Sequence, residues 1–151
     1  MTKPKLYLDN CCFNRPFDDQ SQLHVRLETE AKLYIQEGIK NGTFEIIWSY
    51  VLDEENAYNP FPNKREQILF WKSLAVSDIE ASDEIIQFAN EHVKYGLKSM
   101  DALHIACAIA ASADHFITTD TGILKKKIKG IRAINPLEFF VMYQEGGHQN
   151  E

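Results

Sequence analysis

Long apolar runs are missing from this sequence, and none approaches the ~18 residues that a membrane-spanning helix requires. Cysteine is scarce as well, with three residues in 151, and none stands in a CxxC or Cys/His pair with zinc-site spacing. Two of them, Cys11 and Cys12, are adjacent, and neighbouring cysteines rarely satisfy disulfide geometry. We therefore expect no membrane span, zinc site or disulfide, and we interpret the cysteines as small buried residues in a reducing compartment.

Positive charge is also in short supply. The 16 Lys and Arg residues are outnumbered by 22 Asp and Glu residues, which gives a net charge of −6. This argues against a protein that coats nucleic acid by charge alone. It does not exclude a nuclease, because a metal site built from carboxylates adds negative charge that bound cations offset. The N-terminus lacks the apolar stretch and cleavage site of a signal peptide, so we expect a cytoplasmic protein.

The length and composition predict one domain. Hydrophobic residues make up 44% and charged residues 25%, which is ordinary for a globular chain long enough to bury a core. No internal repeat, low-complexity segment or linker divides the sequence. We expect one domain over residues 1–145 and a disordered tail over residues 146–151, where two glycines precede polar residues.

Segments rich in β-branched and aromatic residues alternate with segments whose apolar residues repeat at helical spacing. The expected strands are residues 5–9, 43–48, a short stretch within 75–81, 115–119 and 131–134. The expected helices are residues 23–38, 64–74, 82–95, 99–111 and 123–128, one after Ser49 and one opened by Pro136, with Ser49, Ser82 and Ser99 as N-caps. This alternation predicts an α/β fold with a central parallel sheet, whose ligands bind beyond the carboxyl ends of the strands.

Four acidic residues fall where such a site is expected. Asp9 and Asp120 directly follow expected strands, Asp101 lies in the first turn of a helix, and Glu55 lies about two turns into another. Carboxylates gathered at one edge repel each other unless a cation lies between them. An all-oxygen ligand set favours Mg²⁺ or Mn²⁺, and such ions can activate water for attack on a phosphodiester.

Each acid also has an ordinary structural explanation. Asp9 can be a turn residue, Asp101 can complement a helix dipole, Asp120 can be an N-cap, and Glu55 can be a solvated helix residue. Only their common position at the sheet edge favours a metal site. We prefer Glu55 over its neighbour Glu54, because Glu55 shares the helix face of the apolar residues that precede it.

The sequence around these acids resembles the four acidic motifs of PIN domains. The matching segments are residues 7–9 (Tyr-Leu-Asp), 48–55 (Trp-Ser-Tyr-Val-Leu-Asp-Glu-Glu), 100–106 (Met-Asp-Ala-Leu-His-Ile-Ala) and 116–120 (Phe-Ile-Thr-Thr-Asp). The resemblance covers about residues 4 to 140 and implies a three-layer α/β/α sandwich, a divalent metal and cleavage of single-stranded RNA. It also implies similarity to VapC-type toxins, which are typically dimers inhibited by a small antitoxin protein. We expect a homodimer.

Several other residues are candidates for supporting roles. Asn10 stands where many PIN domains have Thr or Ser, so its amide is expected to contact the substrate in place of a hydroxyl. Arg15 is expected to grip a phosphate, and Thr119, favoured over Thr118, is expected to lie beside the site. His104 is either a partner of the ligands or a buried, hydrogen-bonded histidine. The lysines at 125–127 and 129 either guide RNA or form a solvated helix face.

Two other functions are compatible with an α/β fold. The first is a catalytically silent PIN-like module that binds RNA or protein, although such a module has no need for four intact acids. The second is a phosphoryl-transfer protein with Asp9 as nucleophile. Haloacid-dehalogenase-type phosphatases have Asp-x-Asp after the first strand, whereas Cys11 stands at the second acidic position here.

Overall fold

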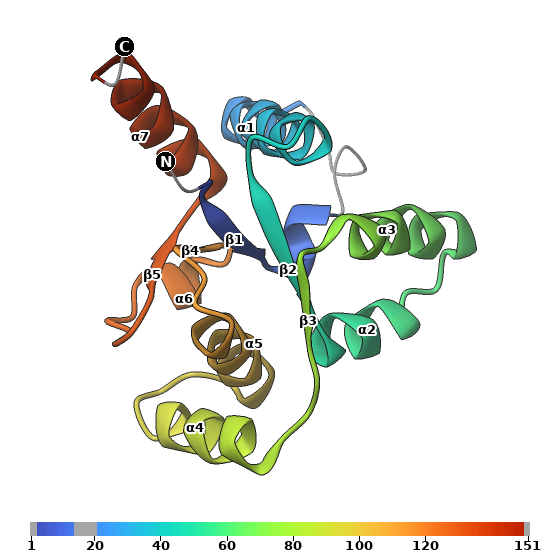
Figure 1. Ribbon diagram of the computed structural model, residues 1–151, viewed down its shortest axis with the longest axis vertical. Coiled ribbons are helices and arrows are strands. Elements are labelled where there is room, and N and C mark those ends of the chain that lie inside the picture. The colour runs from blue at the N-terminus through green and yellow to red at the C-terminus, as the bar shows by residue number, and fades with distance from the viewer. Residues whose placement is uncertain (1–2, 14–20, 150–151) are drawn as a thin grey trace.

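The structure is a computed structural model that describes residues 3–13 and 21–149. Its described residues form one parallel sheet of five strands in the order β3-β2-β1-β4-β5 (Figure 1). The strands are β1 (Lys5–Leu8), β2 (Glu45–Ser49), β3 (Ser77–Ile79), β4 (His115–Ile117) and β5 (Arg132–Ile134). From the central β1 the chain first builds β2 and β3 on one side and then crosses to place β4 on the other. The strand order therefore reverses between β1 and β4, where a ligand site is expected in an open α/β sheet.

Helices cover both faces of the sheet. On one face α1 (Leu23–Lys40) packs against α7 (Pro136–Gln149), and on the other α4 (Asp83–Val93) packs against α5 (Ser99–Ala110) (Figure 1). The remaining helices are the 3-10 helix η1 (Asn10–Phe13), α2 (Tyr50–Ala57), α3 (Pro62–Leu74) and α6 (Thr121–Leu124). The predicted three-layer α/β/α sandwich is thereby confirmed. No helix of the described ranges is long and apolar enough to cross a membrane.

The central strands are buried on both faces, as expected for parallel strands between two helical layers. Leu6, Tyr7 and Leu8 of β1 are at most 1% exposed, and Phe116 of β4 is fully buried. The rings of Tyr7 and Phe116 stack with their centroids 5.4 Å apart across the β1–β4 pair. Tyr7 also carries a hydroxyl into this apolar layer, which must find a hydrogen-bond partner there.

Ser49 and Ser82 are N-caps as predicted, since their side chains accept from the backbone N–H groups of Leu52 and Ile85. Ser99 is not. It is the first residue of α5, which has Lys98 at its N-cap position and no side-chain cap. The acidic side chain of Asp101 in the first turn complements the exposed N–H groups of this helix instead.

The C-terminal third differs from expectation in two elements. The helix expected over residues 123–128 is the shorter α6, which begins earlier because the Asp120 side chain accepts from the backbone N–H of Gly122. The last helix, α7, continues to Gln149, so most of the segment expected to be a disordered tail, residues 146–151, is helical up to that point. A helix already formed gains one hydrogen bond for each residue added, which offsets the weak helix propensity of two glycines.

Candidate metal centre

Asp9 is held in place at the end of β1 by three hydrogen bonds. Its backbone N–H donates to the carbonyl oxygen of Ile117 at 2.9 Å, which extends the β1–β4 pairing by one step. Its carboxylate Oδ2 accepts from the hydroxyl of Thr118 at 2.8 Å, and Oδ1 accepts from the backbone N–H of Asn10 at 2.8 Å. Asp9 is 9% exposed, so its charge lies at a largely dry position where only a few donors oppose it.

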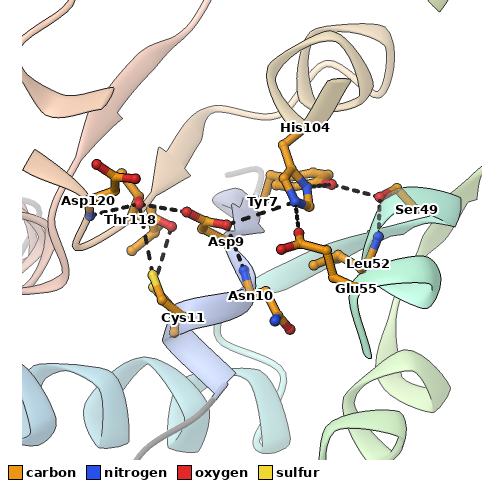
Figure 2. Close-up of polar contacts among 12 residues, drawn as sticks. Tyr7, Asp9, Asn10, Cys11, Ser49, Leu52, Glu55, His104, Thr118 and Asp120 are labelled. Atoms are coloured by element: carbon orange, nitrogen blue, oxygen red, sulfur yellow. Dashed lines mark hydrogen bonds and ion pairs between the residues drawn. The ribbon is translucent and has the colours of Figure 1, made fainter. Parts of the chain in front are cut away.

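Glu55 reaches the same place from α2. The Ser49 cap begins this helix directly after β2, at the carboxyl edge of the sheet, and Glu55 lies on its second turn. The carboxylate Oε1 contacts Nε2 of His104, which comes from α5, while Glu54 beside it is exposed (Figure 2). The helix face selected from the sequence is the face that points toward Asp9.

His104 is fixed by a buried chain of hydroxyl groups. Its Nδ1 lies 2.6 Å from the Tyr7 hydroxyl, which lies 2.6 Å from the Ser49 hydroxyl, and the Ser49 oxygen accepts from the N–H of Leu52 at 3.3 Å (Figure 2). A neutral His104 ring is satisfied by one direction of donation: Ser49 donates to Tyr7, Tyr7 donates to Nδ1, and Nε2–H donates to Glu55. The chain therefore assigns the proton of the ring to Nε2, and it orients Glu55 from behind.

Three potential ligand atoms gather at this point. One atom each from Asp9, Glu55 and His104 lies within 4.8 Å of the others, and His104 Nε2 is 3.9 Å from Asp9 Oδ1. Because Nε2 donates its proton to Glu55, it has no lone pair for a metal. The donors left for a cation are carboxylate oxygens, which fit a hard ion such as Mg²⁺ or Mn²⁺.

Asp101 lies close enough to interact with the same charges. Burial raises the pKa of its carboxyl above the ordinary value, and the negative charges of Asp9 and Asp120 raise it further. Asp101 is outside the three-atom group, but it lies in the first turn of α5, the helix that also carries His104.

Asp120 is the member whose ordinary explanation holds in full. Its Oδ1 accepts from the Gly122 N–H at 2.7 Å and so caps α6. Thr118 lies between Asp9 and Asp120, because its hydroxyl donates to Asp9 and accepts from the Asp120 backbone N–H at 3.1 Å (Figure 2). One oxygen of Asp120 is thus engaged by the protein, and the other has no hydrogen bond among the described residues.

The residues predicted to support the site differ in whether they contact Asp9. The hydroxyl bound to Asp9 is that of Thr118, whereas Thr119, the one favoured from the sequence, donates to the Cys11 sulfur at 3.2 Å. The side-chain oxygen of Asn10 is buried and has no hydrogen-bond partner among the residues described. Arg15 lies outside the described residues.

Sequence reasoning missed the role of Tyr7 and left that of His104 open. Tyr7 lies in an expected strand and in the first matched motif, but nothing local in the sequence shows where its hydroxyl points. A signal for His104 was present, because it follows Asp101 by three residues and so lies one helical turn further along nearly the same face of α5. A buried histidine near a carboxylate is a common partner of metal ligands.

No family model matches this sequence, and comparison with curated proteins finds no similar sequence. Solved structures do share the fold. The crystal structure of FitAcB from Neisseria gonorrhoeae superposes with a TM-score of 0.60 at 15% identity, covering 87% of this chain and 97% of that chain. The crystal structure of VapBC2 from Rickettsia felis, bound to a DNA fragment from their promoter, gives 0.56 at 15% identity and covers 87% and 98%.

The chain has a PIN-domain fold. This confirms the resemblance to VapC-type PIN domains at the level of fold, over nearly the whole length of the matched chains. Identity of 15% carries no residue roles across, so those roles rest on the geometry described above.

Proposed function

We propose that this PIN-domain protein is a divalent-metal-dependent endoribonuclease that cleaves single-stranded RNA. The observation that carries the proposal is the approach of the Asp9 and Glu55 carboxylates, with His104, to within 4.8 Å at the switch point of the sheet. Asp101 adds a third negative charge nearby. Such a concentration of carboxylates is stabilised by a bound cation and is otherwise costly.

In this mechanism Asp9, Glu55, Asp101 and Asp120 hold Mg²⁺ or Mn²⁺. The ion supplies activation of water and stabilises charge on the phosphodiester. Thr118 and Asn10 orient Asp9 through the hydrogen bonds to its two oxygens, and His104 orients Glu55. The proposed substrate contacts come from Asn10 and Arg15, which follow Asp9 in the sequence, and from Thr119, two residues after the end of β4.

We further propose that the protein is the toxin of a toxin–antitoxin pair and a homodimer. The similarity in fold to the chains of FitAcB and VapBC2 supports the first part. For the second, α1 and α3 expose large apolar side chains outside the site: Leu23, Leu27, Leu33, Leu69 and Phe70. Sedimentation at micromolar concentration should show a dimer, and a monomer alone would contradict this part of the proposal.

The activity is tested with purified protein and a short unstructured RNA. The wild type should cut the RNA with Mg²⁺ or Mn²⁺ and stop when a chelator is added. Asp9→Asn and Glu55→Gln should each lower the rate by about 100-fold or more, because each removes a charge that holds the ion. Glu54→Gln is the matched control, since it makes the same chemical change on an exposed neighbour and should leave the rate unchanged.

A catalytically silent binding module is the second candidate. The observation in its favour is that Glu55 and Asp120 each already have a protein partner, His104 and the N-terminus of α6. Calorimetric titration with Mn²⁺ separates the two candidates. Wild-type cleavage that continues in excess chelator, or an Asp9→Asn protein as active as the wild type, would rule out the metal nuclease and leave the binding module.

A further inference from the structure

A cavity of about 320 Å³ lies between the end of α4 and the segment that follows α6. This volume falls within the ~300–1,000 Å³ typical of ligand sites. Its two walls differ in chemistry. One is largely aromatic and the other is basic, and its lining residues include Phe88, His92, Tyr95, Lys126, Lys127 and Lys129.

The aromatic wall is formed by the last turns of α4 and the turn that follows this helix. The rings of Phe88 and His92 stack with their centroids 4.3 Å apart at 27°, and His92 Nδ1 lies 3.0 Å from the Phe88 carbonyl oxygen. Tyr95 follows one turn later and is 78% exposed. The first two rings therefore brace each other, while the Tyr95 ring is open to a ligand. Planar, sequence-tolerant surfaces of this kind stack nucleobases.

The basic wall is concentrated in a protein whose net charge is −6. Lys126, Lys127 and Lys129 are exposed, and none of them forms an ion pair with any carboxylate of the described residues. The Lys126 ammonium lies against the backbone of Gly96, where an added Cβ would be 2.9 Å from Nζ. The two walls thus meet directly. The cavity also contains one acid, Glu91, so its charge remains positive overall.

The cavity is adjacent in the chain to two of the acids. Leu97 lines it and lies four residues before Asp101, at the start of α5. Lys126 lies six residues after Asp120, just beyond α6. A strand of RNA bound at the acids therefore has the cavity within reach of a flanking nucleotide.

We propose that this cavity binds a nucleotide of single-stranded RNA next to the cleavage site, with the base on Tyr95 and the backbone phosphates on Lys126 and Lys127. The choice of substrate rests on the proposed function. An acidic peptide would satisfy the lysines but not the open aromatic ring, whereas RNA uses both walls.

The proposal is tested by fluorescence anisotropy of a labelled, unstructured RNA with Ca²⁺ in place of Mg²⁺, and with gels to verify that the RNA stays intact. Tyr95→Leu should raise Kd about tenfold, the effect of losing one base–aromatic stack. Tyr95→Phe keeps the ring and should bind like the wild type. Lys126→Gln/Lys127→Gln should lower the slope of log Kd against log salt by about 1.4, which is ~0.7 for each phosphate contact on a single strand.

The matched control is Lys3→Gln/Lys40→Gln. These two exposed lysines precede β1 and β2, at the opposite edge of the sheet, and removing them changes the net charge by the same amount. Their loss should leave the salt slope nearly unchanged. An RNA that is abasic at its central positions should bind equally to wild type and Tyr95→Leu.

Unchanged Kd in Tyr95→Leu, an equal effect of the control pair, or no RNA binding by the wild type would overturn the proposal. If Tyr95→Leu weakened binding of the abasic RNA as much as binding of the intact RNA, the site would recognise charge alone, as it would in an acidic peptide. This result would also overturn the proposal. The assay needs no cleavage, so the two proposals fail separately. If the variants change RNA binding as expected but the protein does not cut RNA, the nuclease proposal is wrong and the proposed binding site still stands.

Discussion

The hydroxyl of Tyr7 should stabilise the fold and the active geometry together, and Tyr7→Phe tests both. The substitution leaves the ring and its stacking on Phe116 in place, so it creates almost no cavity. It removes the one atom that joins the Ser49 hydroxyl to His104 Nδ1, each 2.6 Å away and fully enclosed. The His104 ring nitrogen Nδ1 is then left buried without its hydrogen-bond partner.

The expected loss of stability follows from that count. An orphaned buried polar group costs about 1–3 kcal/mol, so we expect a fall of roughly that size in the free energy of unfolding. In a chain of this length about 1 kcal/mol corresponds to roughly 2–4 °C, which predicts a decrease in Tm of about 2–12 °C. Thermal unfolding should be followed in a chelator, so that bound metal does not contribute.

The same change should slow RNA cleavage about tenfold, the usual effect of losing a partner that orients a ligand. Glu55 loses its fixed support once His104 is free to change tautomer. The matched control is Tyr34→Phe on α1, whose hydroxyl bonds the exposed Gln144 and should matter by less than about 0.5 kcal/mol. A Tyr7→Phe protein that melts within the error of the wild type would refute the proton assignment along the chain.

Two further predictions concern titration. Burial, and then the charges of Asp9 and Asp120, raise the pKa of Asp101, so the folded protein keeps a proton that the unfolded chain has released. The unfolding free energy of the metal-free protein should therefore fall as the pH rises from the unfolded pKa through the folded one, and denaturant titrations of Asp101→Asn should show a flatter profile and higher stability at neutral pH. A hydrogen bond with Cys12 lowers the pKa of the Cys11 thiol to about 7. Mass spectrometry should find Cys11 alkylated before the two buried cysteines, with a midpoint near pH 7, and a midpoint typical of a free thiol would contradict this.

The order of helices and strands could be predicted from the sequence, because strands that are buried on both faces consist of continuous apolar residues. The continuous apolar runs in β1, β2 and β4, separated by helical periodicity, were sufficient to predict the parallel sheet. The residues at which helices and strands begin and end were harder to predict. Whether Ser99 or the residue before it caps α5 depends on hydrogen bonds that compete within one turn, and the sequence does not rank them.

Part of the site could be predicted from the sequence for a similar reason. Placing Asp9 and Asp120 after strands required only the sheet, and choosing Glu55 required only a helix face. The roles of Tyr7 and Thr118 depend on the direction of a side chain relative to a neighbouring strand, which is a property of the three-dimensional register. Asp120 shows that the two interpretations of an acidic residue are compatible. It caps α6, as its ordinary structural explanation predicts, and it also lies after a strand, where a site residue is expected.

The pairing of β1 with β4 has a consequence for biosynthesis. Asp9 and the Thr118 hydroxyl that orients it are 109 positions apart in the chain, and the strands that carry them are direct neighbours. Contacts of such long separation form late, after the entropy of closing the intervening loop has been offset by other contacts. A nascent chain that has emerged from the ribosome only as far as α4 therefore has Asp9 and Glu55 but neither His104 nor β4 to organise them. If the protein cuts RNA, a nascent copy can do so only after α5 and β4 have left the ribosome.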